Sequence, residues 1–202
     1  MLRRKSGRSR VSGGSDEPCR MSSRKIPPSA RLLVSAIYRE EGRFEEVLSN
    51  LGTRLGPVER TSGPFLFDRT DYYEREMGAP LYRRFVVMER LVPRDQLAAV
   101  KIEAEELERM FSVNGMRTVN LDPGILTEES FLLATGKNFS HRVYLRDGVF
   151  AELALLFRKG EYRPLPWTYP DLASEGIRAF LAEVREELRE ARKREGRPAR
   201  CG

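Results

Sequence analysis

The sequence has few of the residues that build redox, metal and membrane sites. Of its 202 residues two are cysteines, Cys19 and Cys201, and both lie in the terminal tails, with no Cys-x-x-Cys pair. Nothing here indicates a disulfide framework or a zinc knuckle, and a reducing, cytoplasmic setting is expected. His141 is the single histidine, so histidine-rich metal centres are excluded.

Long apolar segments are lacking as well. The longest nearly apolar run, Val149 to Phe157, contains Glu152 and is too short to span a bilayer. The N-terminus is basic, but no apolar stretch follows it, so no secretory signal is predicted. We expect a soluble protein without a membrane partner, and Met21 is a second candidate for the start of translation.

The basic character of the chain belongs to its ends. Residues 1–30 carry a net charge of +6 and residues 189–202 carry +4, while the whole chain carries +6, so the body between them carries −4. A body that grips a phosphate backbone shows the opposite balance. We therefore expect no sequence-specific nucleic-acid binding, and only the tails suit nonspecific contacts.

Turn signals and apolar periodicity divide the rest of the chain into elements. The composition predicts a disordered basic arm over 1–29, one α+β domain over 30–193 and a disordered basic tail over 194–202. The order of elements predicts a ferredoxin-like βαββαβ core with a mainly antiparallel sheet, extended by a β-hairpin and a C-terminal helix. Strands are expected at 32–38, 58–67 (broken near 62–64), 82–91, 116–121, 141–146 and 149–158, and helices at 44–55, 93–111, 127–136 and 174–188.

The predicted hairpin brings the histidine close to a buried carboxylate. A two-residue turn at Asp147-Gly148 pairs Val143 with Glu152, which places His141 and Glu152 on one face as diagonal neighbours. Such a pair is either an oriented catalytic acid or base, or an ion pair at the edge of the core. The ion pair is the commoner arrangement.

Two further segments have polar residues next to turn signals. Asn120-Leu121-Asp122-Pro123-Gly124 is expected to form a tight turn at a strand end, where Asp122 either contacts a ligand or only shapes the turn. Ala134-Thr135-Gly136-Lys137 resembles part of a phosphate loop, but the earlier glycine and the final hydroxyl are missing. Lys137 then meets a phosphate as a point charge or complements a helix dipole.

Carboxylates and aromatics gather in two loops. Asp68, Asp71, Glu76 and Asp122 are the oxygen ligands that a Mg²⁺ site would use, although Asp/Arg pairs that hold the loop together are the simpler interpretation. No metal site is predicted with defined ligands. The segment from Trp167 to Asp171 is either an aromatic lid or a clamp that fastens the last helix to the sheet, and we favour the clamp.

Together these stretches resemble a bacterial and archaeal family, domain of unknown function 4416. The resemblance spans roughly residues 31–189 and rests on Phe67-Asp68-x-Thr70-Asp71-Tyr72-Tyr73-x-x-Glu76-Met77-Gly78, Asn120-Leu121-Asp122-Pro123-Gly124, His141-Arg142, Ala151-Glu152 and Trp167-Thr168-Tyr169-Pro170-Asp171. The family has no established activity, so the resemblance supplies no catalytic residue and no cofactor. Members have carried the label "GTP-binding protein", but the P-loop and an Asn-Lys-x-Asp motif are missing here, and Gly136 and Leu172-Ala173 depart from the usual residues.

Two functions remain open from the sequence. In the first, the domain binds a small anionic ligand, phosphorylated or nucleotide-like, and is an enzyme or a binding protein. The side chains that would attract the anion are Arg83, Arg84, Lys137, His141 and Arg142. The proton acceptors or metal ligands would be Asp71, Asp122 and Glu152. The catalytic pair would be His141 and Glu152. In the second, the protein is a noncatalytic partner-binding or assembly protein whose basic tails contact an acidic partner. The concentration of unusual residues in loops and near strand ends favours the first.

Overall fold

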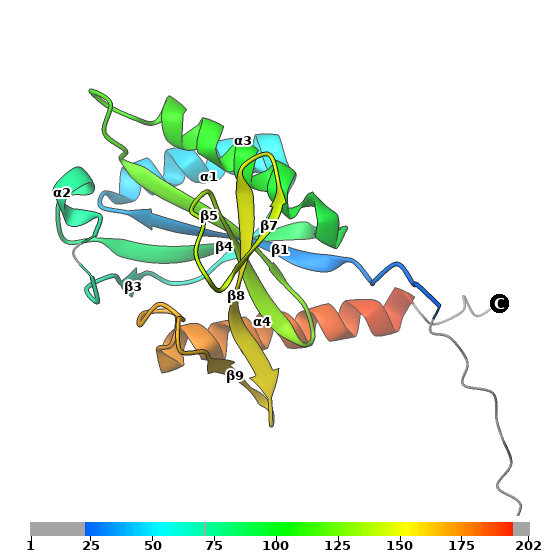
Figure 1. The fold of residues 1–202 in the computed structure, drawn as a ribbon. Coiled ribbons are helices and arrows are strands. Elements are labelled where there is room, and N and C mark those ends of the chain that lie inside the picture. Colours follow the sequence, from blue (N-terminus) through cyan, green and yellow to red (C-terminus); the bar gives the residue numbers. More distant parts are fainter. Residues whose placement is uncertain (1–22, 71, 196–202) are drawn as a thin grey trace, which may run out of the picture.

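The computed structural model describes residues 23–70 and 72–195, which form one mixed α/β structure (Figure 1). Asp71, the N-terminal arm up to residue 22, with Met21 and Cys19, and the tail from residue 196, with Cys201, lie outside the described residues. Residues 23–29 have no regular secondary structure and are mostly exposed. No helix in the described part of the chain is long and apolar enough to cross a membrane.

A single sheet of nine strands runs through the described residues, and all its pairings are antiparallel. The strand order is β2-β4-β1-β5-β6-β8-β7, while β3 also pairs with β4 and β9 with β8. This confirms the mainly antiparallel α+β class. The strands are β1 (Ala30–Tyr38), β2 (Val58–Thr61), β3 (Phe65–Leu66), β4 (Tyr82–Val92), β5 (Val119–Leu126), β6 (Ser130–Thr135), β7 (Arg142–Arg146), β8 (Val149–Arg158) and β9 (Glu161–Pro164).

Helices cover both faces of this sheet (Figure 1). On one face α1 (Glu41–Leu55) and α3 (Leu97–Met110) pack their apolar stripes against β1, β4 and β5, as the predicted periodicity requires. On the other face α4 (Glu175–Glu195) buries Ile177, Leu181, Val184 and Leu188 against β4, β6 and β8. A 3₁₀ turn, η1 (Arg94–Gln96), precedes α3, and α2 (Glu74–Met77) is a single turn before β4.

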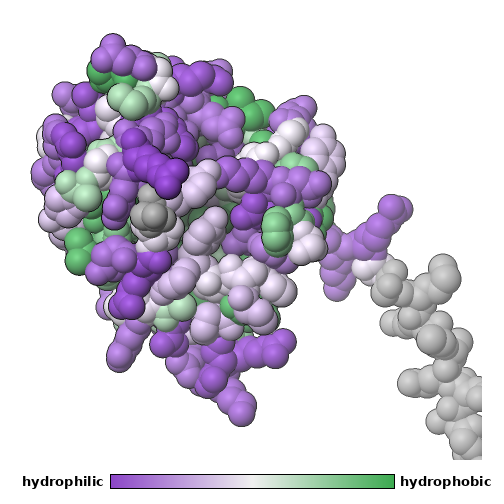
Figure 2. All heavy atoms as spheres, turned by 60° about the vertical axis from the view of Figure 1, so that its left-hand side comes forward, coloured by the Kyte–Doolittle hydropathy of each residue, from purple (hydrophilic) through white to green (hydrophobic). Residues whose placement is uncertain are grey.

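The strands between these layers alternate their side chains from face to face. In β4, Phe85 and Val87 pack towards α4, whereas Val86 and Met88 pack towards α1 and α3. Both faces are therefore apolar in the middle of the sheet. The end of the sheet that carries α2 is mainly hydrophilic on its surface, with separate small apolar patches (Figure 2).

The segment 127–136, expected as a short helix, is a strand. Thr127 does not cap a helix, because its backbone and hydroxyl contact Ser130 in the turn that joins β5 to β6. Phe131 and Leu133 then extend between β5 and β8, where Phe131 is fully buried. Residues 131–134 form a continuous apolar run, whose periodicity does not distinguish a buried strand from a buried helix, so pairing with two neighbouring strands decided the structure.

The tight turn expected at Asn120–Gly124 is also wrong, because these residues lie inside β5 and pair with β1. Gly124 has no positive φ. A Cβ atom there would lie 2.6 Å from the carbonyl oxygen of Leu132 and 2.8 Å from the ring of Phe131, so glycine permits the close approach of β6. Pro123 is tolerated because β6 pairs only with residues 124–126 of β5.

The hairpin forms at Asp147-Gly148, but its register is shifted by one residue from the predicted one. The shift occurs between Tyr144 and Arg146, so Arg142, in place of Val143, lies opposite Glu152. The extra residue has a physical benefit, because it gives the buried carboxylate a guanidinium partner instead of an aliphatic one.

Candidate functional site

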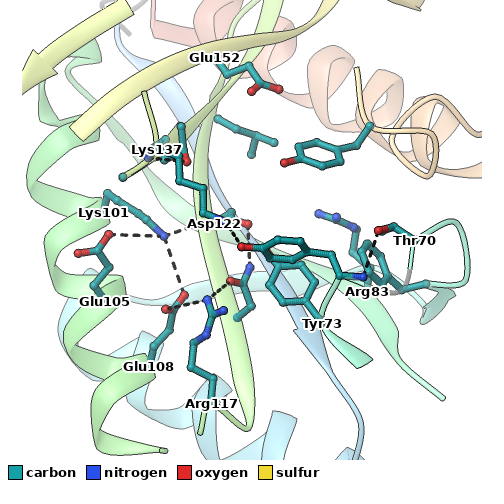
Figure 3. A pocket seen from close by; sticks show the side chains of 18 of the residues that line it. Thr70, Tyr73, Arg83, Lys101, Glu105, Glu108, Arg117, Asp122, Lys137 and Glu152 are labelled. Carbon is teal, nitrogen blue, oxygen red and sulfur yellow. Dashed lines mark hydrogen bonds and ion pairs between the residues drawn. The ribbon is translucent and has the colours of Figure 1, made fainter. Parts of the chain in front are cut away.

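A cavity lies where β5 and β6 separate. The two strands pair only between Gly124–Leu126 and Phe131–Leu133, and beyond this point β6 follows β8 instead. A cavity of about 410 Å³ fills the opening, lined by Asn120 and Asp122 of β5 and by residues 133–137 (Figure 3). The Asn-Leu-Asp-Pro-Gly segment thus marks the division of the sheet. Gly124 is the last point of contact, and Pro123 has no N–H to continue the pairing.

Two charged side chains of α3 form hydrogen bonds with the backbone of β5 at the edge where β6 no longer pairs with it. Lys101 Nζ donates to the carbonyl oxygen of Leu121 at 2.9 Å, and the N–H of Leu121 donates to Glu108 Oε1 at 2.5 Å. Both side chains are buried. A buried backbone group without a partner is costly, so these contacts stabilise the exposed edge of β5. Their first role is structural.

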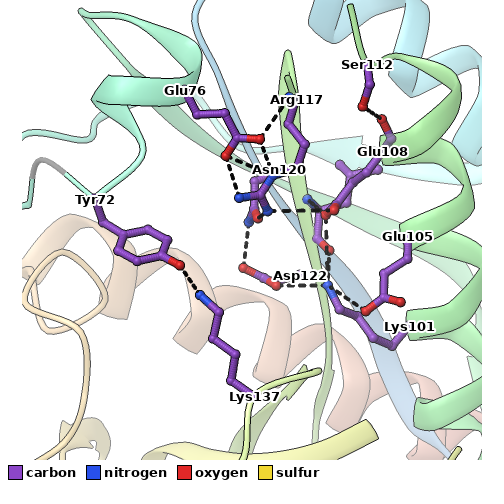
Figure 4. A network of polar contacts seen from close by, with 11 residues as sticks. Tyr72, Glu76, Lys101, Glu105, Glu108, Ser112, Arg117, Asn120, Asp122 and Lys137 are labelled. Atoms are coloured by element: carbon purple, nitrogen blue, oxygen red, sulfur yellow. Dashed lines mark hydrogen bonds and ion pairs between the residues drawn. The ribbon is translucent and has the colours of Figure 1, made fainter. Parts of the chain in front are cut away.

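The same two side chains belong to a polar network that crosses the cavity wall (Figure 4). Lys101 Nζ lies 3.2 Å from Asp122 Oδ1, and Asp122 Oδ2 accepts from Asn120 Nδ2 at 2.7 Å. Arg117 continues the chain, donating to Asn120 Oδ1 at 2.8 Å and pairing with Glu76 at 2.7 Å. Asp122, a predicted ligand contact, is therefore already held on both oxygens, although a quarter of its side chain is exposed.

Burial shifts the protonation of this network. Burial raises the pKa of Glu108 to about 7, against the opposing effects of nearby Lys101 and the Leu121 N–H. Burial acts to lower the pKa of Lys101, but Asp122, Glu108 and Glu105 together raise it above its ordinary value. Lys101 therefore stays charged, while Glu108 can exchange a proton near neutral pH.

Glu152 of β8 stands on another wall of the cavity and is almost completely buried. Its Oε2 atom accepts a hydrogen bond from Arg142 Nε at 2.8 Å and also contacts His141 Nε2 at 3.2 Å. Arg142 lines the cavity too, whereas His141 is not among its lining residues and contacts the carboxylate of Glu152. The proximity predicted for His141 and Glu152 is present, although the shifted register adds Arg142 as the closer partner.

The aromatic segment after β9 fixes the position of the histidine. The His141 ring stacks on Trp167 with ring centroids 5.1 Å apart and an interplanar angle of 9°. Trp167 Nε1 donates to the carbonyl oxygen of Leu153, and Thr168 Oγ1 donates to that of Ala154. The segment thus clamps onto β8, and Tyr169, two residues beyond Trp167, reaches the cavity wall.

Lys137 lies on the exposed side of the cavity, directly after β6. Its ammonium contacts the Tyr72 hydroxyl and lies 4.2 Å from the centre of that ring. Among the described carboxylates none is close enough to Lys137 for an ion pair. Each other cation of the wall has such a partner: Arg83 with Asp171 at 2.5 Å, Lys101 with Asp122, Arg117 with Glu76 and Arg142 with Glu152.

The remaining predicted residues lie elsewhere. Arg84 is on the opposite face of β4, where it pairs with Glu41 at 2.8 Å and covers the Phe44 ring. Arg83, its neighbour, lines the cavity instead, and Asp71 lies outside the described residues. Of the loop carboxylates, Asp68 Oδ1 lies 3.5 Å from Arg69 Nε, and Glu76 forms an ion pair with Arg117. In the described part of the chain no group of three or more His, Cys, Asp or Glu side chains is placed to hold a metal ion.

Sequence reasoning missed Lys101 and Glu108, although the sequence has a signal for both. They follow Leu97 and Ala104 by four residues each, so they fall within the apolar stripe of α3 that faces the sheet. A charge in such a stripe must find a buried partner. This rule would have placed both side chains at the sheet.

Comparison with known proteins gives one match. The family model described as "Domain of unknown function (DUF4416)" matches residues 28–188, which include every element from β1 to most of α4. No curated protein and no solved structure matches the chain.

Proposed function

Since the chain belongs to the DUF4416 family, whose description names no activity, we propose from the cavity itself that the protein binds a small anionic ligand, phosphorylated or nucleotide-like. The observation that carries the proposal is Lys137, the one cavity cation without an ion-pair partner among the described residues. The ligand's anionic group takes the place of that partner.

The surroundings of Lys137 support this position for the anion. Arg142 Nη1 donates to the carbonyl oxygen of Lys137 at 3.0 Å, which holds the guanidinium against the Lys137 backbone, and both residues line the cavity. Tyr72 and Tyr73 stand at the same opening in an edge-to-face pair, and together with Tyr169 they provide aromatic surface for a planar group. A volume of about 410 Å³ lies in the range of pockets that hold small organic ligands.

Chemistry on such a ligand would use Glu152 as proton acceptor or donor. The carboxylate is buried, lines the cavity and is oriented by His141, which is the arrangement of an acid–base residue with a positioning partner. Whether the bound ligand reacts is tested separately, by following its turnover.

We also propose that the first half of the chain forms a ferredoxin-like unit. The order β2-β4-β1-β5, with α1 and α3 on one face, supports a ferredoxin-like unit to which β6 to β9 and α4 are added. In this description the cavity lies at the junction between the unit and its extension, because β5 belongs to the first and β6 to the second.

A partner-binding function is the alternative. It is favoured by exposed apolar side chains at the free edge of the sheet around β7: Phe139, Val143, Tyr144 and Leu145. Size-exclusion chromatography with light scattering, and the same measurement on Tyr144→Lys, test it. An assembly that Tyr144→Lys dissociates would favour this alternative.

The ligand proposal is tested by thermal shift with a panel of nucleotides and phosphorylated metabolites on the full chain. A binding compound should raise the Tm of the wild type by several degrees at 100-fold excess over its Kd. Lys137→Ala should abolish the shift, while Lys193→Ala, which removes the same charge from an exposed position on α4, should keep it. No shift with any compound, or an equal shift in both variants, would reject the proposal.

A further inference from the structure

One oxygen of Glu152 has no hydrogen-bond partner among the described residues. The Oε1 atom is buried and receives no hydrogen bond in the described structure, whereas Oε2 receives two donors. Buried carboxylate oxygens are nearly always hydrogen-bonded, because an unpaired acceptor loses its water without replacement. Glu152 lines the cavity and both protein donors, Arg142 and His141, contact Oε2, so we place the missing donor in the cavity.

The charge around Glu152 indicates what kind of group is missing. Arg142 already supplies a full positive charge at 2.8 Å, so the carboxylate does not need a second cation. It needs an N–H or O–H group that donates a hydrogen bond. The anion expected at Lys137 occupies the same cavity, since Lys137, Arg142 and Glu152 all line it.

We propose that the ligand of this cavity carries a hydroxyl or amino group near its anionic group, and that Glu152 Oε1 accepts the hydrogen bond from it. The ligand class is then a phosphorylated polyol, sugar or amino sugar, or the ribose phosphate part of a nucleotide. This inference rests on the proposed function, and it adds a specificity-determining residue to it.

The carboxylate is held ready for this contact. His141 stacks on Trp167 and also contacts the tilted ring of Phe139, with ring centroids 5.1 Å from each, so the imidazole has little freedom to turn. Its contact with Oε2, together with that of Arg142, leaves Oε1 as the atom available to the ligand. A donor that meets a preoriented acceptor loses little entropy on binding.

Three probes of similar size test the inference by titration calorimetry at pH 8: glucose 6-phosphate, glucosamine 6-phosphate and cyclohexylmethyl phosphate. The first two carry hydroxyl or amino donors, and the third carries none beside its phosphate. We expect the wild type to bind at least one donor-bearing probe about 10-fold or more tightly than the cyclohexyl compound, which corresponds to one hydrogen bond to a charged group. The better of the two identifies the donor as hydroxyl or amine.

Glu152→Gln is the decisive variant. The amide oxygen can keep Arg142, which turns the amide N–H₂ towards the cavity and replaces an acceptor with a donor. The preference for donor-bearing probes should fall to about 1-fold, while Glu161→Gln, an exposed glutamate on β9, should keep it. A preference that persists in Glu152→Gln would overturn the inference.

The failures of the two proposals can be told apart. If none of the three probes binds, and no compound of the thermal-shift panel raises the Tm, the proposed function is rejected. If all three bind with equal affinity and lose affinity in Lys137→Ala, the anion site stands and the role of Glu152 is wrong. The wild-type ratio decides this even if Glu152→Gln is too unstable to titrate.

Discussion

Replacing Glu152 with alanine should destabilise the fold, and the size of the effect tests the description of the site. Glu152 is 2% exposed and is the ion-pair partner of Arg142, whose side chain is 10% exposed. Removing one member of a buried pair typically costs about 3–5 kcal/mol. Arg142 keeps its bond to the Lys137 carbonyl oxygen and faces a cavity that water can enter, so we expect about 2–3 kcal/mol here.

Urea denaturation gives this number directly. The midpoint should fall while the slope m stays unchanged, because the native and unfolded states keep their surface areas. Glu152→Gln keeps the shape and an acceptor for Arg142, so it should cost about 1–2 kcal/mol. Glu161→Ala, at an exposed ion pair on β9, should change stability by less than about 0.5 kcal/mol. A loss below about 0.5 kcal/mol for Glu152→Ala would refute the buried pair.

Two further predictions concern the division of the sheet. Burial raises the pKa of Glu108 to about 7 from 4.5, so its contribution to stability is complete below pH 4.5 and is lost as the pH rises through 7. Glutamine does not titrate, so from pH 5 to pH 8 the wild type should lose roughly 3 kcal/mol of unfolding free energy relative to Glu108→Gln. A difference between the two proteins that does not change with pH contradicts the raised pKa. Gly124→Ala should cost about 1–3 kcal/mol, since its Cβ would meet Leu132 at 2.6 Å, whereas Gly52→Ala, with open space in α1, should stabilise by about 0.5–1 kcal/mol; equal midpoints for the two would disprove the close approach of β6.

The regular elements of the fold could be predicted because each has a local signal. Phe44, Val47 and Leu51 recur at helical spacing, and they are the buried residues of α1. Asp147-Gly148 favours a two-residue turn because both positions take a positive φ, and they have φ values of 52° and 77°. In these cases the sequence within a few residues determines the structure.

The errors arose where a partner distant in sequence decides the structure. Pro123 in a strand contradicts the local rule, and only the absence of β6 beside it makes the strand tolerable. Leu145 gave no local sign of the bulge that turns Arg142 towards Glu152. Arg83 and Arg84 could not be separated by sequence either, since helices cover both faces of β4 and either side chain could have faced the cavity.

The division of the sheet also separates the structural charges from those available for function. Where β6 leaves β5, the backbone of Leu121 loses a partner strand, and Lys101 and Glu108 take over its hydrogen bonds. These side chains are needed to keep β5 in place, so their burial and shifted pKa values need no ligand to explain them. Lys137 and the Oε1 atom of Glu152 have no such structural role in the described residues, and Arg142 contacts both Lys137 and Glu152. A ligand that joins an anion to a hydrogen-bond donor would satisfy both at once, which is why we place function at these two groups and not at Lys101 and Glu108 of α3.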